Sequence, residues 1–174
     1  MNNTKYENVE LNGEELKKYI AERFPKEEKK EPVQEVYHAF PNGLSLNDPR
    51  VVAVSQSADV TPEEAFELLD NEDWICLTDE EADEMAREYI LDSVWAFNSD
   101  FLAHHSDSGV QVFNILKEAC EDANSAILTL IKDTDYFVED AINADGRGHF
   151  MSSYDGEEYE ENIDGEFWYC YRLN

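Results

Sequence analysis

Carboxylates are the side chains of this sequence that are dense enough to do chemistry. Residues 79–92 hold seven of them and a single base, Arg87. As a helix that rises 1.5 Å per residue, this segment would carry one carboxylate for about every 3 Å of axis, close to the roughly 3.4 Å between charges along one DNA strand. Such a helix would present a phosphate-like field to a groove that binds nucleic acid. Its acids are Asp79, Glu80, Glu81, Asp83, Glu84, Glu88 and Asp92.

A second acidic cluster lies near the C-terminus, where residues 155–165 carry six acids and no base. For residues 79–92, a solvated helix face whose first-turn acids favour the helix dipole is the simpler interpretation. The composition of the whole chain favours a surface that binds a partner, because 41 acids against 13 bases give a formal net charge of −28. We therefore predict that a partner is bound by the seven acids above together with Glu157, Glu158, Glu160 and Glu161.

The charge is unevenly distributed along the chain. Residues 1–32 contain seven bases and eight acids, whereas residues 33–174 contain six bases and 33 acids. A charge of this size destabilises the compact state through self-repulsion, so we expect a basic partner that offsets it. Direct binding to nucleic acid or to an anionic membrane surface is excluded on the same electrostatic ground. Adaptation to high salt is a poorer explanation, because six of the eight lysines lie in the first 30 residues.

Other kinds of chemistry have weaker support. A pair of carboxylates could serve a hydrolase, yet among 41 acids some pair always lies at a suitable distance. His104, His105 and His149 could ligate zinc, but adjacent histidines on a helix point in different directions. The Asp133-Thr134-Asp135 run lacks the glycine and the terminal glutamate of a calcium loop. We expect no catalytic residue, no metal site and no cofactor.

Cysteine usage and hydropathy bear on the compartment. Cys76, Cys120 and Cys170 are widely spaced and odd in number, which predicts reduced core residues in a cytosolic protein, with no metal or redox spacing among them. The longest uncharged runs, such as 51–58 and 123–131, are far shorter than the roughly 18 residues of a membrane-spanning helix. We therefore expect a protein of the host cytoplasm with no membrane span.

Local patterns predict the elements that position the acids. Capping boxes beginning at Thr61 and Thr78, together with apolar residues at helical spacing, indicate several helices. Alternation with period two and turn-rich flanks indicate short strands. The predicted helices cover residues 16–24, 61–69, 79–103, 110–131 and 133–146. The predicted strands cover residues 33–40, 50–57, 149–154 and 166–172, and the type of residues 74–77 stays open.

Two short segments connect these elements. The glycines of Gly146-Arg147-Gly148 allow a positive φ, so this run is expected to turn the chain from helix to strand. Arg147 is one of only six bases after residue 32, and we expect it to pair with local carboxylates and tie the C-terminal hairpin to the helices. The aromatic strand 167–171 is predicted to be a core strand, with Trp168 as an alternative anchor for a partner.

Three runs of the sequence carry a resemblance to known proteins. Residues 77–84, 93–98 and 145–158 resemble segments of small acidic proteins carried by phages and mobile elements, over roughly residues 74–172. The resemblance implies a mobile-element origin and no particular activity. In composition alone, the chain is similar to DNA-mimic anti-restriction and anti-CRISPR proteins.

These patterns lead to one prediction of fold and function. We expect an α+β fold with three C-terminal helices packed with a small antiparallel sheet that includes a C-terminal hairpin. Residues 1–32 form a mobile segment with one short helix, and 33–174 an acidic domain. The predicted function is a non-enzymatic, mobile-element-encoded inhibitor of a basic nucleic-acid-binding host protein, a restriction enzyme or CRISPR effector. The alternatives are an acidic adaptor or chaperone that shields a basic DNA-binding protein, and a carboxylate-based hydrolase. The oligomeric state stays open, with a dimer as one option.

Overall fold

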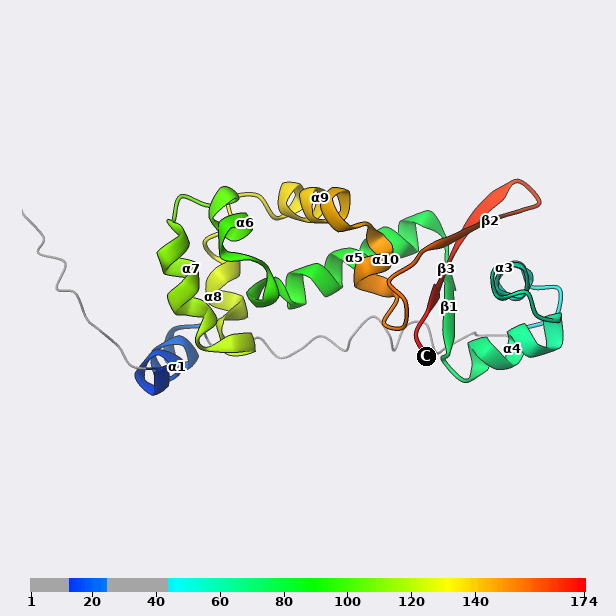
Figure 1. The fold of residues 1–174 in the computed structure, drawn as a ribbon, viewed down its shortest axis with the longest axis horizontal. Coiled ribbons are helices and arrows are strands. Elements are labelled where there is room, and N and C mark those ends of the chain that lie inside the picture. The colour runs from blue at the N-terminus through cyan, green and yellow to red at the C-terminus, as the bar shows by residue number, and fades with distance from the viewer. Residues whose placement is uncertain (1–12, 25–43) are drawn as a thin grey trace, which may run out of the picture. The chain divides into compact units, whose positions relative to one another are not determined.

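A computed structural model describes residues 13–24 and 44–174 (Figure 1). Helices surround a three-stranded antiparallel sheet, so the α+β prediction is confirmed. The chain divides into two compact units. Residues 44–92 and 134–174 form the acidic unit, and residues 13–24 and 93–133 form the helical unit. The boundary predicted at residue 32 lies outside the described residues.

The sheet belongs to the acidic unit. It has the order β1-β3-β2, with β1 at Trp74–Leu77, β2 at Tyr159–Ile163 and β3 at Glu166–Arg172. The hairpin between β2 and β3 turns at Asp164 and Gly165, which both have positive φ, as a tight hairpin turn of the I′ type requires. The predicted strand 166–172 and the C-terminal hairpin are therefore confirmed.

The first strand of that hairpin was predicted wrongly. Residues 149–154 are not a strand but belong to helix α10, Arg147–Met151, and to the turn after it. A side chain at Gly148 would lie 2.5 Å from the carbonyl oxygen of Gly156, so this glycine permits a close backbone contact that folds the turn back. The strand instead forms from the acidic connector, where Tyr159 and Ile163 are half-buried and Glu160 is exposed.

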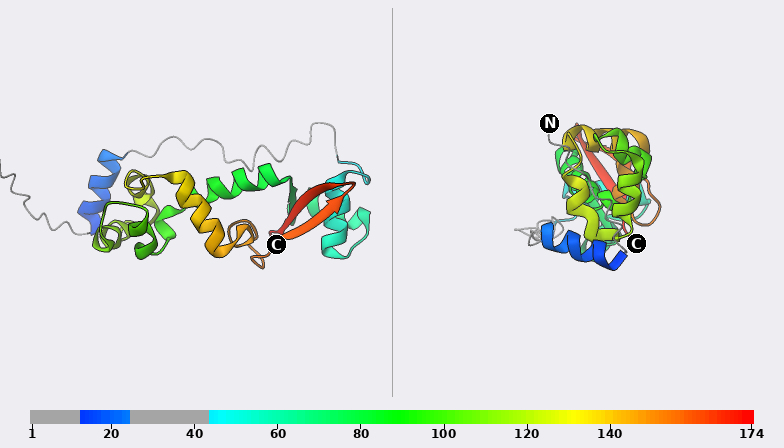
Figure 2. Two further views of the ribbon diagram at one scale, coloured as in Figure 1. Left: turned by 90° about the horizontal axis from the view of Figure 1, so that it is seen from above. Right: turned by 90° about the vertical axis from the view of Figure 1, so that its left-hand side faces the viewer.

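Helices cover both faces of the sheet (Figures 1 and 2). Helices α3, Pro49–Ala58, and α4, Pro62–Asp70, lie on one face, where Val54, Trp74 and Trp168 share a core. On the other face, α5, Asp79–Asp92, and α10 share a core with Leu77 and Tyr171. Helix α9, Thr134–Asp145, contacts both α5 and α10. This arrangement fixes α5 beside the hairpin.

Residues 50–57 were predicted as a strand but form helix α3. The Asp48 side chain accepts a hydrogen bond from the Arg50 backbone N–H, and Pro49 occupies the first turn, which is a strong helix start. Val51 and Val54 lie on the buried face three residues apart. The β-branched residues that suggested a strand are thus the apolar stripe of a helix. The predicted strand 33–40 lies outside the described residues.

The helical unit has no strand among its described residues. It begins with α1, Gly13–Arg23, whose Leu16 and Ile20 side chains are buried, so the predicted N-terminal helix is confirmed. The predicted helices 79–103 and 110–131 are each broken into shorter pieces. After α5 come the 3₁₀ turn η1 and α6; then α7, the 3₁₀ turn η2 and α8 follow. Their bounds are Val94–Ala96, Ser99–His104, Val110–Lys117, Cys120–Ala123 and Asn124–Leu128.

Local backbone chemistry explains both breaks. Asn98 accepts a hydrogen bond from the Asp100 backbone N–H and so caps a new helix after α5 ends. Cys120 has a φ of 53°, which an α-helix cannot accommodate. The breaks also change the predicted three-helix cluster, since the middle group, residues 110–131, belongs to the helical unit and α5 and α9 belong to the acidic unit.

Candidate functional site

The acidic face of α5 is the centre of the candidate site. The helix begins with a capping box, in which the Thr78 hydroxyl accepts from the Glu81 N–H at 3.3 Å and the Glu81 carboxylate accepts from the Thr78 N–H at 2.8 Å. Glu80, Glu84 and Glu88 follow at four-residue intervals and are exposed. Within the described residues these three carboxylates form no ion pair.

The buried side of α5 consists mainly of small side chains. Ala82, Ala86 and Ile90 enter the core and Met85 packs against it, whereas Tyr89 is 55% exposed. Because small alanines face the sheet, α5 can approach it closely, and its larger side chains extend along the flank.

Arg147 collects three of the predicted site carboxylates. Its Nη1 donates to Asp79 Oδ1 at 2.7 Å and to Asp83 Oδ1 at 2.8 Å. Its Nε and Nη2 form a bidentate pair with Glu158 at 2.9 and 3.2 Å. The guanidinium also lies over the Tyr169 ring, 4.3 Å from the ring centroid. The expectation that Arg147 ties the hairpin segment to the helices is confirmed.

The electrostatics of this cluster follow from its burial. The Arg147 side chain is only 11% exposed, and burial alone would lower its pKa. The hydrogen bonds to Glu158 and Asp79 outweigh burial and raise the Arg147 pKa. The Tyr171 hydroxyl donates to Glu158 Oε2 at 2.6 Å, and burial together with this carboxylate raises the Tyr171 pKa. Both groups thus keep their protons. The Arg147 cluster, formed by Arg147, Asp79, Asp83 and Glu158, therefore stabilises the fold.

Two more of the predicted site residues have partners inside the acidic unit. Glu81 accepts from Arg50 Nη2 at 3.3 Å, and Arg50 also donates to the Cys76 carbonyl and lies 5.0 Å from the Trp168 ring centroid. Glu161 accepts from the Ser57 hydroxyl at 3.1 Å. Glu157 and Glu160, by contrast, are exposed. The C-terminal cluster therefore supplies a smaller open surface than its six acids suggested.

Every base of the acidic unit is an arginine engaged with a neighbour. Beyond Arg50 and Arg147, Arg87 pairs with Asp135 at 2.7 Å. Arg172 lies 3.5 Å from the centroid of the Tyr154 ring and donates to the Asn174 carbonyl. The described residues of this unit hold 26 acids and these four arginines, a formal net charge of −22. The four arginines therefore contact neighbours inside the unit, whereas most of its acidic side chains are exposed to solvent.

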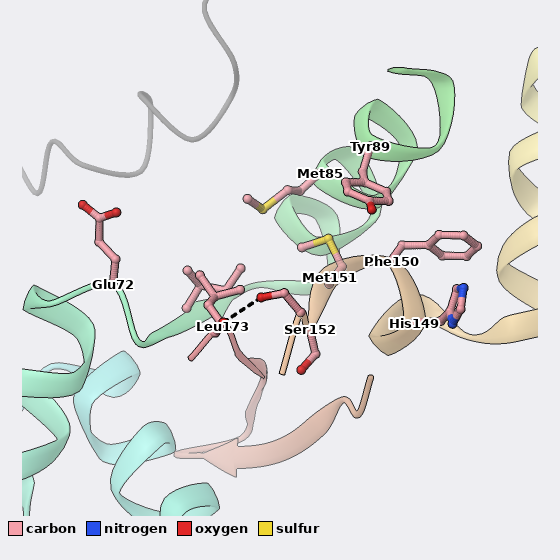
Figure 3. Close-up of a pocket in the computed structure, with 10 residues that line it drawn as sticks. Glu72, Met85, Tyr89, His149, Phe150, Met151, Ser152 and Leu173 are labelled. Carbon is pink, nitrogen blue, oxygen red and sulfur yellow. Dashed lines mark hydrogen bonds between the residues drawn. The ribbon is translucent and has the colours of Figure 1, made fainter. Parts of the chain in front are cut away.

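A pocket of about 210 Å³ lies beside α5 (Figure 3). Met85, Tyr89, Phe150 and other apolar side chains line most of it, and its polar groups come from Glu72, His149, Ser152 and Ser153. The Ser152 hydroxyl bonds to Asp155 and to the Arg172 carbonyl, and the Ser153 hydroxyl donates to the Leu173 carbonyl. Both hydroxyls thus hold the C-terminal segment in place. The pocket is smaller than a typical site for a drug-sized ligand.

The remaining sequence candidates can also be placed. His104 is exposed at the end of α6 and His105 is buried, with their rings 5.3 Å apart. Asp133 directly precedes α9, and Asp135 lies in the first turn of that helix. Among the described residues no group of three histidine, cysteine, aspartate or glutamate side chains could hold a metal ion. In the same part of the chain, no helix is long and apolar enough to cross a membrane.

The prediction that strand 167–171 belongs to the core is confirmed at Trp168, which is 6% exposed, so the alternative of a surface anchor at this residue is wrong; its neighbour Phe167 is 51% exposed. Sequence reasoning missed how the cysteines are placed. Cys120 is exposed, contrary to the expectation of a core residue, and Cys76 and Cys170 are neighbours across two strands. Residues 74–77 and 168–171 share a pattern in which a tryptophan is followed two positions later by a cysteine. This pattern could have predicted the pairing, but only if residues 74–77 had been identified as a strand.

Comparison of the chain with protein-family models, with curated proteins and with solved structures found no match. The mobile-element origin inferred from residues 77–84, 93–98 and 145–158 therefore stays a prediction.

Proposed function

We propose that the acidic unit is a polyanionic decoy that occupies the nucleic-acid groove of a basic protein. One observation carries this proposal: the four arginines of the unit all engage neighbours within it, while its acids outnumber them by 26 to four. A surface with that composition repels nucleic acid and attracts cationic grooves. A structural role alone would not require so large an excess of acids, which raises the self-repulsion of the folded unit.

The α5 surface provides the phosphate-like spacing. Six of its seven acids are exposed over 14 residues, and Glu81 is the exception. At 1.5 Å per residue this corresponds to a carboxylate for about every 3.5 Å of axis, against roughly 3.4 Å along one DNA strand. Asp79 and Asp83 share the charge of Arg147 but remain 66% and 63% exposed. The Arg147 cluster therefore fixes the position of these acids on α5 while their carboxylates remain exposed to solvent.

Binding would proceed by replacement of phosphates with carboxylates. The basic groove releases its own counterions when it meets the acidic unit, as it does when it binds nucleic acid. Many weak contacts share the energy, so the affinity falls steeply as salt rises. In this proposal the chain is a mobile-element product in the host cytoplasm, its target is a restriction enzyme or a CRISPR effector, and it performs no catalysis.

The test has two steps. The protein is first used at low salt to capture its partner from a bacterial host lysate, and the partner is purified. Binding is then measured from about 50 to about 500 mM salt, in the presence and absence of duplex DNA. We expect DNA and this protein to exclude each other, and the affinity to fall steadily with salt. A partner that holds both at once would contradict the decoy and support the adaptor.

Matched variants make the test specific. Glu80→Gln, Glu84→Gln and Glu88→Gln together remove three exposed charges from α5, and we expect roughly a tenfold loss of affinity, mostly in the association rate. The control removes three exposed charges from the helical unit, through Asp100→Asn, Glu118→Gln and Glu121→Gln. An equal loss in both proteins would show that net charge matters and the α5 surface does not. Salt-insensitive binding abolished by Phe167→Ala alone would instead indicate an aromatic anchor.

A further inference from the structure

Two of the three cysteines meet across the sheet. Cys76 of β1 and Cys170 of β3 are directly opposite each other in the antiparallel register, and their Sγ atoms are 3.2 Å apart. Both side chains are buried in the core beneath α3 and α4. Cys120, by contrast, lies in the helical unit and is exposed. We propose that Cys76 and Cys170 form a redox modification site, which a peroxide converts into a disulfide between β1 and β3.

The geometry is close to that of a disulfide. Residues directly opposite on antiparallel strands have Cβ atoms about 4.5–5.5 Å apart, and a disulfide needs about 3.5–4.5 Å. The sulfur atoms must approach by roughly 1.2 Å to reach a bond length of about 2.04 Å. The two side chains already point to the same face of the sheet and toward each other. Bond formation therefore requires a small local adjustment and no rearrangement of the strands.

The reaction proceeds in two steps. The thiolate of one cysteine attacks an oxygen of hydrogen peroxide, so the O–O bond breaks, a sulfenic acid forms and hydroxide leaves, which takes up the proton released by the thiol and becomes one water. The sulfur of the second cysteine then attacks the sulfenic sulfur, the S–O bond breaks and a second water leaves as the S–S bond forms. In total the two thiols give up two protons and two electrons, and one peroxide becomes two waters. The site thus needs a peroxide as its only co-reactant.

Burial controls the rate of this reaction. The hydrogen bond with Cys170, together with burial, raises the pKa of the Cys76 thiol, so the reactive thiolate is scarce in the closed sheet. Strand β1 is an edge strand of only four residues, and its local opening is the route by which peroxide gains access. Oxidation of the pair should therefore be slower than oxidation of exposed Cys120. Once formed, the bond closes a long loop, because 94 positions separate the two cysteines.

The experiment uses the full chain with Cys120→Ser, which leaves the pair as the only thiols. The protein is treated with hydrogen peroxide, quenched, and digested without reduction. We expect the intact mass to fall by two hydrogen atoms, and the peptides containing Cys76 and Cys170 to be joined until a reductant separates them. The loop closure predicts that the thermal midpoint rises by roughly 5–10 °C.

Three outcomes would overturn the proposal. One is a gain of oxygen on each cysteine separately, as sulfinic or sulfonic acid, with no joined peptide. The second is that Cys76 and Cys170 both remain free thiols, even on prolonged treatment under conditions in which Cys120 of the wild-type protein reacts completely. The third is a fall in the thermal midpoint, which would show that the bond does not fit the native sheet. A Cys76→Ser, Cys120→Ser control must show no loss of hydrogen.

Discussion

The acidic unit and the helical unit differ in how they use positive charge. The described residues of the acidic unit have a net charge of −22 and no lysine, and their four arginines contact carboxylates, carbonyl groups or aromatic rings. The described residues of the helical unit hold nine acids and five lysine or arginine side chains, four of which are exposed. Lys132, for example, pairs with Asp107 at 2.5 Å on an exposed surface.

This difference shows how a strongly acidic unit can stay folded. Arginine offers five donors in a planar fork and stacks on aromatic rings, so one side chain can hold several elements together. Arg147 alone joins α5, α10 and the segment that leads into β2. A lysine could not make the same set of contacts. A few arginines thus stabilise the acidic unit from within and leave its outer surface negative.

The largest effect is expected at Arg147. In Arg147→Met, the carboxylates of Asp79, Asp83 and Glu158 lose their shared cation, and Glu158 is half-buried beside Tyr171. We expect the free energy of unfolding to fall by about 2–4 kcal/mol. The measurement is urea unfolding by tryptophan fluorescence in a Trp95→Phe background, because the remaining tryptophans, Trp74 and Trp168, both lie in the acidic unit.

Arg87 provides the control for this prediction. Its pair with Asp135 lies on the surface, where the carboxylate is 81% exposed. Arg87→Met should therefore change the free energy of unfolding by less than about 1 kcal/mol. Equal losses in the two variants would mean that Arg147 has no special place in the fold.

Backbone packing around α10 gives the next largest effect. A methyl group in Gly148→Ala would meet the backbone of Gly156 and Glu157 at 2.5–2.7 Å, and neither can move without opening the turn. We expect a loss of about 1–3 kcal/mol, measured by thermal denaturation followed by circular dichroism. Gly109→Ala in the helical unit is the control, since its nearest neighbour is the Gln111 side chain at 3.2 Å. A wild-type midpoint for Gly148→Ala would contradict the close contact.

Removing charge from α5 should stabilise the acidic unit slightly. Glu80, Glu84 and Glu88 are like charges at i, i+4, and each such pair costs about 0.2–0.5 kcal/mol. Their joint change to glutamine is therefore expected to raise the free energy of unfolding by about 0.5–1 kcal/mol at low salt, with the gain lost at high salt. Charge reversal to lysine should likewise preserve the fold. Collapse of the circular dichroism signal in either triple variant would show that these acids are structural.

The smallest effect concerns acid pH. Burial alone would raise the pKa of Asp155, but hydrogen bonds from Ser152, the Glu157 N–H and Tyr159 lower it below its ordinary value of 3.8. Because the folded pKa is the lower one, Asp155 stabilises the fold above the unfolded pKa and loses that contribution as pH falls through the folded pKa. The carboxylate is exposed, so the effect is small.

Asp155→Asn tests this sign. The variant should be less stable than the parent at neutral pH, and the two should converge as the pH falls below 3.8. Unfolding in urea at a series of pH values measures the difference. A stability gap that widens toward acid would contradict the lowered pKa.

The sequence by itself determined the features that depend on neighbouring residues. The capping boxes at Thr61 and Thr78 and the helices that follow them are local, because a cap needs only a side chain and a backbone N–H three residues away. The strand 166–172 was evident from its alternation, and the role of Arg147 from the scarcity of bases around it. The charge that underlies the proposed function is likewise a property of composition.

Only the tertiary structure decided which acids stay open and which cysteines meet. The sequence offers no way to distinguish Glu81 and Glu158 from Glu80 and Glu84. In the structure Glu81 pairs with Arg50 and Glu158 pairs with Arg147, so both are only partly exposed. The same holds for residues 50–57 and 149–154, whose apolar residues suit either a strand or a helix until the surrounding core selects one. Local patterns fix propensity, whereas pairing between residues tens of positions apart depends on how the chain folds back on itself.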